Sequence, residues 1–519
     1  MNTYPDIPAE PAPRRGALWT FLGLALVLLL QVLAALPALE APGMVLDEGV
    51  LLSYPELLHR GAIPQRDYES QYPPGNVWLL AGAYSLFGTS IYVERGVGML
   101  YQTALAAGIF LLLSRWNRVA ATVGAALCVL ALVPVTLVAF AWLGAVAFAV
   151  WSLAAISAGG REEWRGLAAG ALAGLALTWR VDLGMALTLA LGGYCILAKW
   201  RMRHLRWLAL GGAVALLPML GHALVVTPAV FFDRVFVRPV FTTHAGRILP
   251  LDFSRAFVGQ LYAVLIVSIG AGLFAAWRLH RRATPGHPAL VALALLALGA
   301  LPQAMQRADV IHMSFVTPLA LPLLAVVAAV FFPAQRYAPV AVFAVVFALL
   351  PQLGAGVRAR LAGTAFQPEN VFMVHSGSRV FPVGDRAFAK SAQAIIQLLA
   401  RDSKPGESVF VGPKDLRFAM ANDNFLYHLL PWLKPRSYFL EFNPDDANRP
   451  GSCLAADIAD TDWVILNPVW SSLREPNASQ VPGPDAPNEM VRERFDLVFT
   501  RAPFELYKRR PQLSQSAAR

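Results

Sequence analysis

Charged residues are scarce in this sequence of 519 amino acids: Asp, Glu, Lys and Arg make up 15% of it, whereas hydrophobic residues make up 56%. An ordinary soluble domain carries about 25% charged residues, so this composition excludes such a protein and indicates an integral membrane protein. Cysteine is rarer still, with three residues. Cys453 stands alone in the C-terminal third, so no disulfide can form within that part.

Several motifs are also missing. The sequence has no Gly-rich phosphate loop and no internal repeat, and its nine histidines are scattered without metal-ligand spacing. We therefore predict no cofactor and no metal site, although an outer loop could bind a divalent cation through Asp47 or Glu48. The net charge of +10 does not indicate nucleic-acid binding, because Arg and Lys gather in short loops between apolar segments, as is typical of cytoplasmic loops.

Apolar segments of membrane length fill the first two-thirds of the chain. The first runs from Ala17 to Leu39, and at about 1.5 Å per residue it can cross a core of about 30 Å. Arg14 and Arg15 precede it, which predicts a cytoplasmic start and a first outer loop over residues 40–75. Further apolar segments lie at 74–89, 91–114, 119–135, 138–158, 165–179, 183–198, 206–226, 258–278, 288–302, 312–332 and 337–353.

The side on which the chain ends depends on whether segment 74–89 crosses the membrane. If it crosses, the five basic connectors between later segments all lie outside, against the usual distribution of charge. The segment is short and is introduced by Pro73-Pro74, and without it all five connectors become cytoplasmic. We therefore predict about eleven spans within residues 17–353, a cytoplasmic tail over 1–16, and a C-terminal domain outside the cytoplasmic (inner) membrane.

The last third, over residues 366–510, reads as a soluble α/β domain that follows the polytopic α-helical part. Helical and strand patterns alternate there, which is typical of this class of domain. The predicted helices are Asp385–Ala400, Asn424–Leu433 and Leu454–Ala459, and the predicted strands are Ser408–Gly412, Ser437–Glu441, Trp463–Asn467 and a hairpin of Phe495–Arg501 with Phe504–Lys508. Residues 475–489 are predicted to be loop, and 511–519 a frayed tail.

Polar residues concentrate at the outer ends of the spans. Carboxylates near a membrane are costly and persist mainly for function, and the first outer loop holds Asp47, Glu48, Glu56, Asp67 and Glu69. Later outer connectors add Arg180 with Asp182, and Arg307 with Asp309 and His312. Each has a structural alternative. We expect Glu56 to lie on a solvated helix face, whereas Arg66 and Arg180 could form local ion pairs and His312 could be an interfacial histidine. Together they predict a site on the outer face.

The motifs of this loop resemble those of a known superfamily. The acidic pair Asp47-Glu48 is followed by the spacing Gly61-x-x-Pro64-x-x-Asp67 and by Tyr-Pro-Pro-Gly at 72–75. Further matches are Leu86 to Ser90 with Arg95, Gln306 to Asp309 with His312, and Leu426 to Ser437 in the soluble part. This pattern resembles the GT-C superfamily of membrane glycosyltransferases, which take sugars from polyprenyl-phosphate donors.

The resemblance implies an inverting glycosyltransferase, either a hexosyl- or a pentosyltransferase, with its transmembrane domain as the catalytic part. Asp47 would deprotonate an acceptor hydroxyl, with Glu48 beside it as the second catalytic acid. The expected ligands of sugar or acceptor hydroxyls are Asp67, Glu69 and Tyr72, and those of the donor phosphate are Arg66, Arg180, Arg307 and His312. The expected partners are the polyprenyl-phosphate sugar, a glycan, lipid or protein acceptor, and membrane lipids.

Other functional classes stay open at this point. A transporter or lipid flippase could use Asp182, Arg307 and Asp309 as an intramembrane relay, although transporters often contain repeats. A sensor with an outer ligand-binding domain would leave the loop acids without a role. An outer cavity lined by Asp47, Asp67 and Arg307 would favour the enzyme, whereas a central cavity open to both sides would favour transport.

Overall fold

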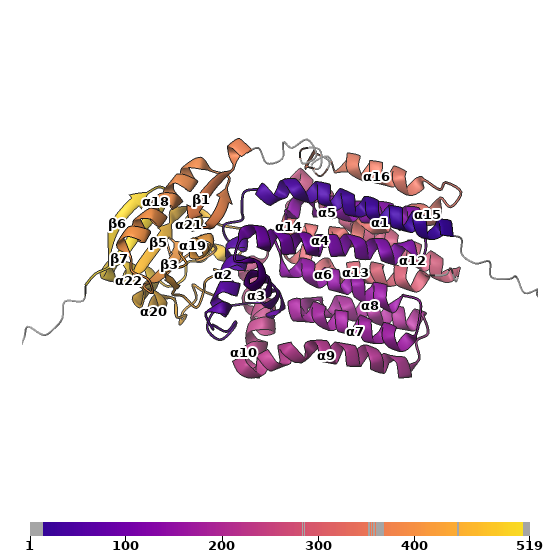
Figure 1. Ribbon diagram of the computed structural model, residues 1–519, viewed down its shortest axis with the longest axis horizontal. Helices are drawn as coiled ribbons and strands as arrows, with labels where there is room; N and C mark the ends of the chain where they lie inside the picture. The colour runs from indigo at the N-terminus through magenta and orange to yellow at the C-terminus, as the bar shows by residue number, and fades with distance from the viewer. Residues whose placement is uncertain are drawn as a thin grey trace, which may run out of the picture.

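The computed structural model describes residues 14–282, 284, 286–350, 353, 355, 356, 359, 368–443 and 446–511. Within them a bundle of long helices carries an α/β domain at one end (Figure 1). Residues 1–13 and 512–519 of the two predicted tails lie outside the described part.

A helix forms on each predicted apolar segment. The helices are α1 (Arg14–Ala35), α3 (Gly75–Phe87), α4 (Ile91–Ser114), α5 (Arg118–Leu132), α6 (Ala141–Ile156), α7 (Glu162–Trp179), α8 (Gly184–Leu197), α9 (Met202–Val226), α12 (Ala256–Arg281), α13 (His287–Gln306), α15 (Thr317–Phe331) and α16 (Ala338–Leu349). Six helical stretches of the described chain are long and apolar enough to cross a membrane. The chain is therefore a multi-pass membrane protein, as its composition predicts.

Helix α3 is one of the short apolar helices. Its 13 residues span only about 20 Å, which is less than a hydrocarbon core of about 30 Å. Figure 1 places α3 beside α2 (Asp47–His59) near the α/β domain, whereas helices such as α4, α6 and α9 run along the bundle. Helix α16, which was predicted to cross, has only 12 residues, so length alone does not decide whether segment 74–89 crosses. The number of spans and the orientation of the chain stay predictions.

Short helices occupy the end of the bundle that faces the α/β domain. They are α10 (Pro228–Phe232), the π-helix η4 (Asp233–Thr242) and α11 (His244–Arg247), which all fall in the long connector before α12, and α14 (Val310–Ser314) before α15. Figure 1 shows α2, α10 and α14 at this end of the bundle, beside the α/β domain.

The α/β domain is built on a five-stranded sheet with the order β4-β3-β5-β7-β6. Strand β3 (Ser408–Pro413) pairs in parallel with β4 (Lys434–Pro435) and β5 (Trp463–Asn467). Strand β7 (Phe504–Arg509) is antiparallel to both β5 and β6 (Phe495–Arg501). The remaining elements are the hairpin β1 (Phe372–Ser376) and β2 (Arg379–Val383), and the helices α18 (Arg386–Asp402), α19 (Phe425–Leu429), α20 (Leu454–Ala459), α21 (Pro468–Ser472) and α22 (Ala486–Arg494).

The two faces of this sheet pack into different cores. Val409 and Val411 of β3 belong to a core that is continuous with the helix bundle, whereas Phe410 between them packs into a separate core with α20 and α22. This alternation follows from the two-residue period of a strand. Because one of its cores is shared, the domain is tied to the bundle. Its folding as an independent unit stays a prediction.

Three predictions about local structure in the domain are wrong. Residues Ser437–Glu441 form no strand, because Phe439 N–H bonds to the Ser437 hydroxyl and the Tyr438 carbonyl accepts from Glu69 N–H at 2.6 Å instead of from a strand. The helix predicted to Leu433 ends at Leu429, shortly before Pro431, which cannot continue it. The predicted loop over 475–489 contains the start of α22 at Ala486.

Helix α2 makes close contacts with the α/β domain. The Phe425 N–H of α19 donates to the Val45 carbonyl at 3.0 Å. Gly49 makes this approach possible, since a Cβ atom there would lie 2.3 Å from Phe425 N and 2.6 Å from the Asn424 carbonyl carbon. Farther along α2, Glu56 accepts from Arg379 at 2.7 Å and lies 2.9 Å from His428. The ion pair in which Glu56 takes part therefore ties α2 to the domain, and the prediction of a solvated Glu56 is wrong.

We predict that Gly49→Ala destabilises the protein, because the clash is with backbone atoms that cannot rotate away. Overpacking of this kind costs about 1–3 kcal/mol, so the thermal unfolding midpoint of the purified protein in detergent should fall. Gly82→Ala in α3 is the matched control, since a Cβ there meets nothing within 4 Å. Equal midpoints for the two variants would contradict the tight contact of α2 with α19.

Candidate active site

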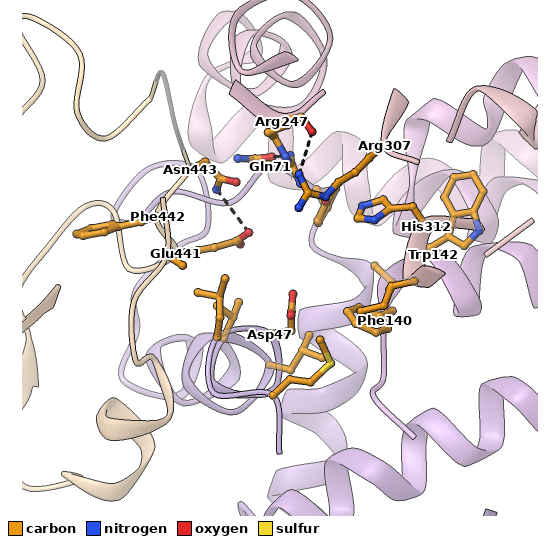
Figure 2. Close-up of a pocket in the computed structure, with 18 of the residues that line it drawn as sticks. Asp47, Gln71, Phe140, Trp142, Arg247, Arg307, His312, Glu441, Phe442 and Asn443 are labelled. Carbon is orange, nitrogen blue, oxygen red and sulfur yellow. Dashed lines mark hydrogen bonds between the residues drawn. The ribbon is translucent and has the colours of Figure 1, made fainter. Parts of the chain in front are cut away.

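A cavity of about 580 Å³ lies where α2, the ends of the bundle helices and the α/β domain meet. Its size is in the range of small-molecule sites. Its polar lining includes Asp47, Gln71, Tyr72, Asn76, Arg180, Arg247, Gln303, Arg307, Asp309, His312, Glu441, Asn443 and Glu475, and its aromatic lining includes Phe140, Trp142, Phe315 and Trp470. The outer connectors and the soluble domain thus build one site (Figure 2).

Asp47 begins α2 and turns its carboxylate into this cavity (Figure 2). In the described part of the chain its side chain has no hydrogen-bond or ion-pair partner. Burial raises the pKa of Asp47 to about 7, and the charges of Glu441 and Glu48 add to the effect. Arg247 and Arg307 act in the opposite direction. A carboxylate with a pKa near neutrality suits a general base, because it is both ionised and able to hold a proton.

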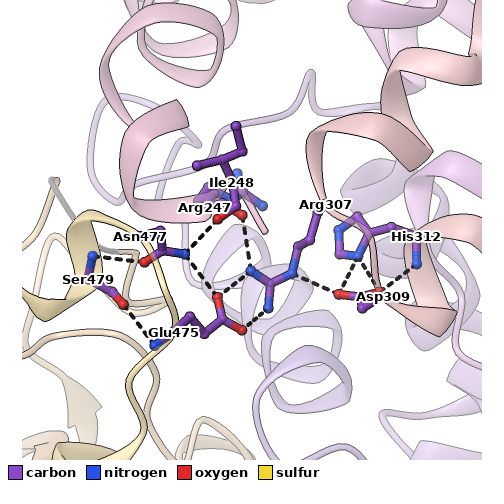
Figure 3. Close-up of polar contacts among 8 residues, drawn as sticks. All are labelled: Arg247, Ile248, Arg307, Asp309, His312, Glu475, Asn477 and Ser479. Atoms are coloured by element: carbon purple, nitrogen blue, oxygen red, sulfur yellow. Dashed lines mark hydrogen bonds and ion pairs between the residues drawn. The ribbon is translucent and has the colours of Figure 1, made fainter. Parts of the chain in front are cut away.

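Arg307 is held by partners on three sides (Figure 3). Its Nε donates to Asp309 at 2.8 Å, and its terminal nitrogens donate to the Arg247 carbonyl at 3.1 Å and to both carboxylate oxygens of Glu475. A guanidinium has five N–H donors, so four are already committed. Asn477 of the soluble domain makes a further link, donating to the Ile248 carbonyl at 2.8 Å. Arg307 therefore joins three segments of the cavity wall.

Arg247 is the least neutralised cation of the cavity. Its guanidinium donates to the Gln71 side-chain oxygen and, at 3.4 Å, to the Tyr72 hydroxyl, and among the described residues no carboxylate pairs with it. Arg180, by contrast, is paired with Asp182 at 2.5 Å and lies 4.1 Å from the centre of the Tyr72 ring. Arg247 is thus the side chain best placed to bind an anionic group from a ligand.

His312 lies beside Arg307 but is bound to Asp309. Its Nδ1 lies 2.9 Å from Asp309 Oδ1. Burial lowers the pKa of His312 although Asp309 opposes the change, so the imidazole is neutral at pH 7. Tyr72 lines the same wall under Arg180. Of the residues predicted for the site, the structure thus brings together Asp47, Tyr72, Arg180, Arg307 and His312.

The other predicted site residues do not line the cavity. Glu48 is buried behind Asp47 and pairs with Arg95 at 2.7 Å, where the two side chains are 1% and 2% exposed. Arg66 and Asp67 form an exposed ion pair with each other at 2.8 Å. Glu69 is buried and pairs with Arg234 of η4 at 2.8 Å. These contacts lie outside the cavity lining.

Several cavity residues were not predicted. Glu441 and Asn443 follow β4, and the sequence placed Glu441 at the end of a strand, which gave it no separate role. Arg247 is one of several polar residues in the long outer connector, and no motif distinguishes it. Glu475 lies in the segment predicted to be loop. The sequence gives little indication of these residues, because tertiary folding brings each of them to the cavity and no local motif marks them.

No protein-family model matches the sequence, and no curated protein is significantly similar to it. Its fold, however, is similar to that of ArnT from Cupriavidus metallidurans. The apo structure has a TM-score of 0.59 at 16% identity over 95% of this chain and 98% of ArnT. The structure bound to undecaprenyl phosphate has a TM-score of 0.56 at 14% identity over 94% of this chain and 97% of ArnT.

A second match is the arabinofuranosyltransferase AftD from Mycobacteria, with a TM-score of 0.50 at 16% identity. This match covers 97% of the present chain but only 40% of AftD. The chain therefore has the GT-C fold, a polytopic helical bundle with a C-terminal α/β domain, as the motifs of the first outer loop predict.

We predict that removing two acids of the loop over residues 40–75 lowers stability by very different amounts. Glu48→Ala leaves the Arg95 guanidinium buried and without its carboxylate, which typically costs about 3–5 kcal/mol. The thermal unfolding midpoint should fall by many degrees or the folded yield should collapse. Asp67→Ala removes one half of an exposed pair and should cost under about 1 kcal/mol. A stable Glu48→Ala variant would show that the Glu48–Arg95 pair does not hold α2.

Proposed function

We propose that this chain, with its GT-C fold, is an inverting glycosyltransferase that moves a sugar from a polyprenyl-phosphate donor to an acceptor hydroxyl. The proposal rests on two unpaired charged groups in one cavity. Among the described residues, the Asp47 carboxylate has no hydrogen-bond or ion-pair partner, and no carboxylate pairs with the Arg247 guanidinium. ArnT in its complex binds undecaprenyl phosphate, which supports a donor of the same lipid-phosphate class.

Asp47 is the proposed general base. The acceptor hydroxyl gives its proton to the Asp47 carboxylate while its oxygen attacks the anomeric carbon of the donor. The bond from that carbon to the phosphate oxygen breaks, and the lipid phosphate leaves with the electron pair. Attack from the face opposite the phosphate inverts the anomeric centre in one step. A base with a pKa near 7 takes the proton at physiological pH and can release it afterwards.

The arginines of the cavity are proposed to hold the lipid phosphate. Arg247 has free capacity for an anion, and an arginine fork suits phosphate oxygens. Arg180 and Arg307 add positive charge nearby, although their carboxylate partners neutralise part of it. Stabilising the phosphate as its charge grows lowers the barrier for its departure. The arginines therefore stabilise the leaving phosphate, and Asp47 deprotonates the attacking hydroxyl.

The position of the cavity supports an enzyme at a membrane surface. Asp47 and Arg307 line one cavity at the end of the bundle beside the α/β domain. Asp67 was expected to line it with them but lies outside it. A transporter would instead place its site deep in the bundle. With the N-terminus in the cytoplasm, we propose that the cavity opens outside the inner membrane.

The direct test is to incubate the purified protein with a panel of polyprenyl-phosphate sugars, with a membrane extract as the source of acceptor. Transfer from at least one hexosyl or pentosyl donor is expected, with release of the polyprenyl phosphate. Neither turnover nor binding with any donor would contradict the proposed function.

We predict that Asp47→Asn lowers turnover by roughly 10²–10⁴-fold, the usual contribution of a positioned base, and leaves donor binding nearly unchanged. In the wild type, activity should fall as the pH drops below about 7. Asp47, whose pKa is raised to about 7, is then protonated and cannot take the proton of the acceptor hydroxyl. Asp67→Asn, on an exposed side chain, should keep its activity. If instead Asp67→Asn is inactive and Asp47→Asn is active, the base lies in the second half of the loop.

Arg247→Ala is predicted to weaken donor binding as well as transfer, because a phosphate contact exists before and during the reaction. Removing one charge-assisted contact should cost about tenfold or more in affinity. Arg247→Lys should recover part of it, since the charge remains but the fork geometry is lost. Wild-type affinity of Arg247→Ala for undecaprenyl phosphate, measured by titration, would remove Arg247 from the phosphate site.

A further inference from the structure

A cavity separate from the candidate active site lies at the end of the bundle opposite the α/β domain. Its volume is about 380 Å³, and its lining includes Arg115, Arg118 and Arg336 together with Trp116 and Asn117. The turn between α4 and α5 and the connector between α15 and α16 supply these residues. We propose that this cavity binds the phosphate of an anionic glycerophospholipid from the adjacent membrane leaflet. The inference concerns a second ligand and does not rest on the proposed function.

Helix α4 places this cavity at the level of a membrane surface. The helix begins near the candidate active site, where Arg95 binds Glu48, and it is one of the stretches that can cross a membrane. Its 24 residues span about 36 Å, whereas a hydrocarbon core is about 30 Å thick. The turn after Ser114 therefore reaches the opposite headgroup layer. Figure 1 shows the start of α1 at this same end, so with the N-terminus in the cytoplasm the leaflet is the cytoplasmic one.

The polar lining of this cavity offers hydrogen-bond donors and positive charge. No carboxylate lines it among the described residues, and the two lining residues not yet named, Ser114 and Val119, are uncharged. The guanidinium groups of Arg118 and Arg336 have no hydrogen-bond or ion-pair partner in the described part of the chain. Asn117 accepts from Ala120 N–H at 3.0 Å through its side-chain oxygen, which leaves its amide N–H groups available. Such a lining selects an anion.

Arg115 is held in place before any ligand arrives. Its Nη1 donates to the Ala154 carbonyl and to the Ser157 hydroxyl at the end of α6, both at 2.6 Å. A guanidinium has five N–H donors, so three remain for an anion. Arginine donors match phosphate oxygens in geometry as well as in charge. Because Arg115 is already ordered, less conformational entropy is lost when it binds a phosphate.

The surroundings of the cavity favour a lipid over free phosphate. Phe332 and Tyr337 stand on either side of Arg336 in the connector between α15 and α16, and both are exposed. Exposed aromatic side chains are typical of the membrane–water interface, and basic pockets between membrane helices on the cytoplasmic side bind acidic headgroups. Since α15 and α16 pack against α5, a phosphate shared by Arg118 and Arg336 ties their connector to the turn between α4 and α5.

The test measures lipid binding to the purified full-length protein in detergent at physiological ionic strength, by native mass spectrometry. The probes are dioleoyl phosphatidylglycerol, dioleoyl phosphatidylcholine, glycerol phosphate and inorganic phosphate. The wild type should bind phosphatidylglycerol at least about tenfold more tightly than phosphatidylcholine, and Arg118→Gln/Arg336→Gln should lose most of this preference. Arg201→Gln/Arg282→Gln is the matched control and should keep the preference, since it removes two exposed arginines at the same end that do not line the cavity.

The other outcomes overturn the inference in distinct ways. Equal affinity of the wild type for the two lipids, or an unchanged preference in Arg118→Gln/Arg336→Gln, shows that the cavity binds no headgroup. An equal loss in the control variant shows that the attraction is spread over the basic surface. Displacement of phosphatidylglycerol by an equal concentration of glycerol phosphate or inorganic phosphate assigns the cavity to a free phosphate.

A further variant separates binding from misfolding. Arg118→Lys/Arg336→Lys keeps both charges and loses the fork geometry, so it should recover part of the preference for phosphatidylglycerol. Thermal unfolding midpoints measured without added lipid should be equal for the wild type and all variants. If the lysine variant recovers nothing while its midpoint matches the wild type, charge at these two positions does not bind the lipid and the inference fails.

Discussion

The buried ion pair between Glu48 and Arg95 is the interaction on which the rest of the site depends. Arg95 of α4 binds Glu48 and also donates to the carbonyls of Leu39 and Ala41, at 2.6 and 2.8 Å. It thereby fixes the end of the first apolar helix to the start of α2. Burying two charges is costly unless their hydrogen bonds are satisfied, and here most of them are. The ion pair holds the start of α2, and the neighbouring Asp47 points into the cavity with no partner among the described residues.

The cavity is completed only when the α/β domain packs on the bundle. The domain supplies Glu441, Asn443 and Glu475, and Glu475 is bound to Arg307 of the bundle. The contact of α19 with Gly49 and the ion pair of Glu56 hold the domain on α2. Because Gly49 and Glu56 lie on the same helix as Asp47, a change at the interface between the two parts is expected to affect the geometry of the site as well as stability.

Much of the fold could be predicted from the sequence, and about half of the site. The apolar segments, β3, β5 and the closing hairpin have strong periodicity, so their positions follow from local pattern alone. Asp47 and Arg307 were found because they belong to motifs at the ends of spans. Glu48, Glu69, Arg66 and Asp67 stand in the same loop but do not line the cavity. Arg66 and Asp67 pair with each other, whereas Glu48 and Glu69 are held by Arg95 and Arg234, which no local pattern pairs with them. Arg247 and Glu441 reach the cavity through tertiary packing, to which sequence spacing is insensitive.

In the proposed function, the cavity between α2 and the α/β domain holds the phosphate of a lipid-linked sugar opposite Asp47. The most direct measurement is an experimental structure of the purified protein with undecaprenyl phosphate. The account predicts density for the phosphate within hydrogen-bond distance of the Arg247 guanidinium, with the isoprenoid chain leaving between the bundle helices. A phosphate bound at the opposite end of the bundle, or a cavity that stays empty at saturating lipid, would contradict it.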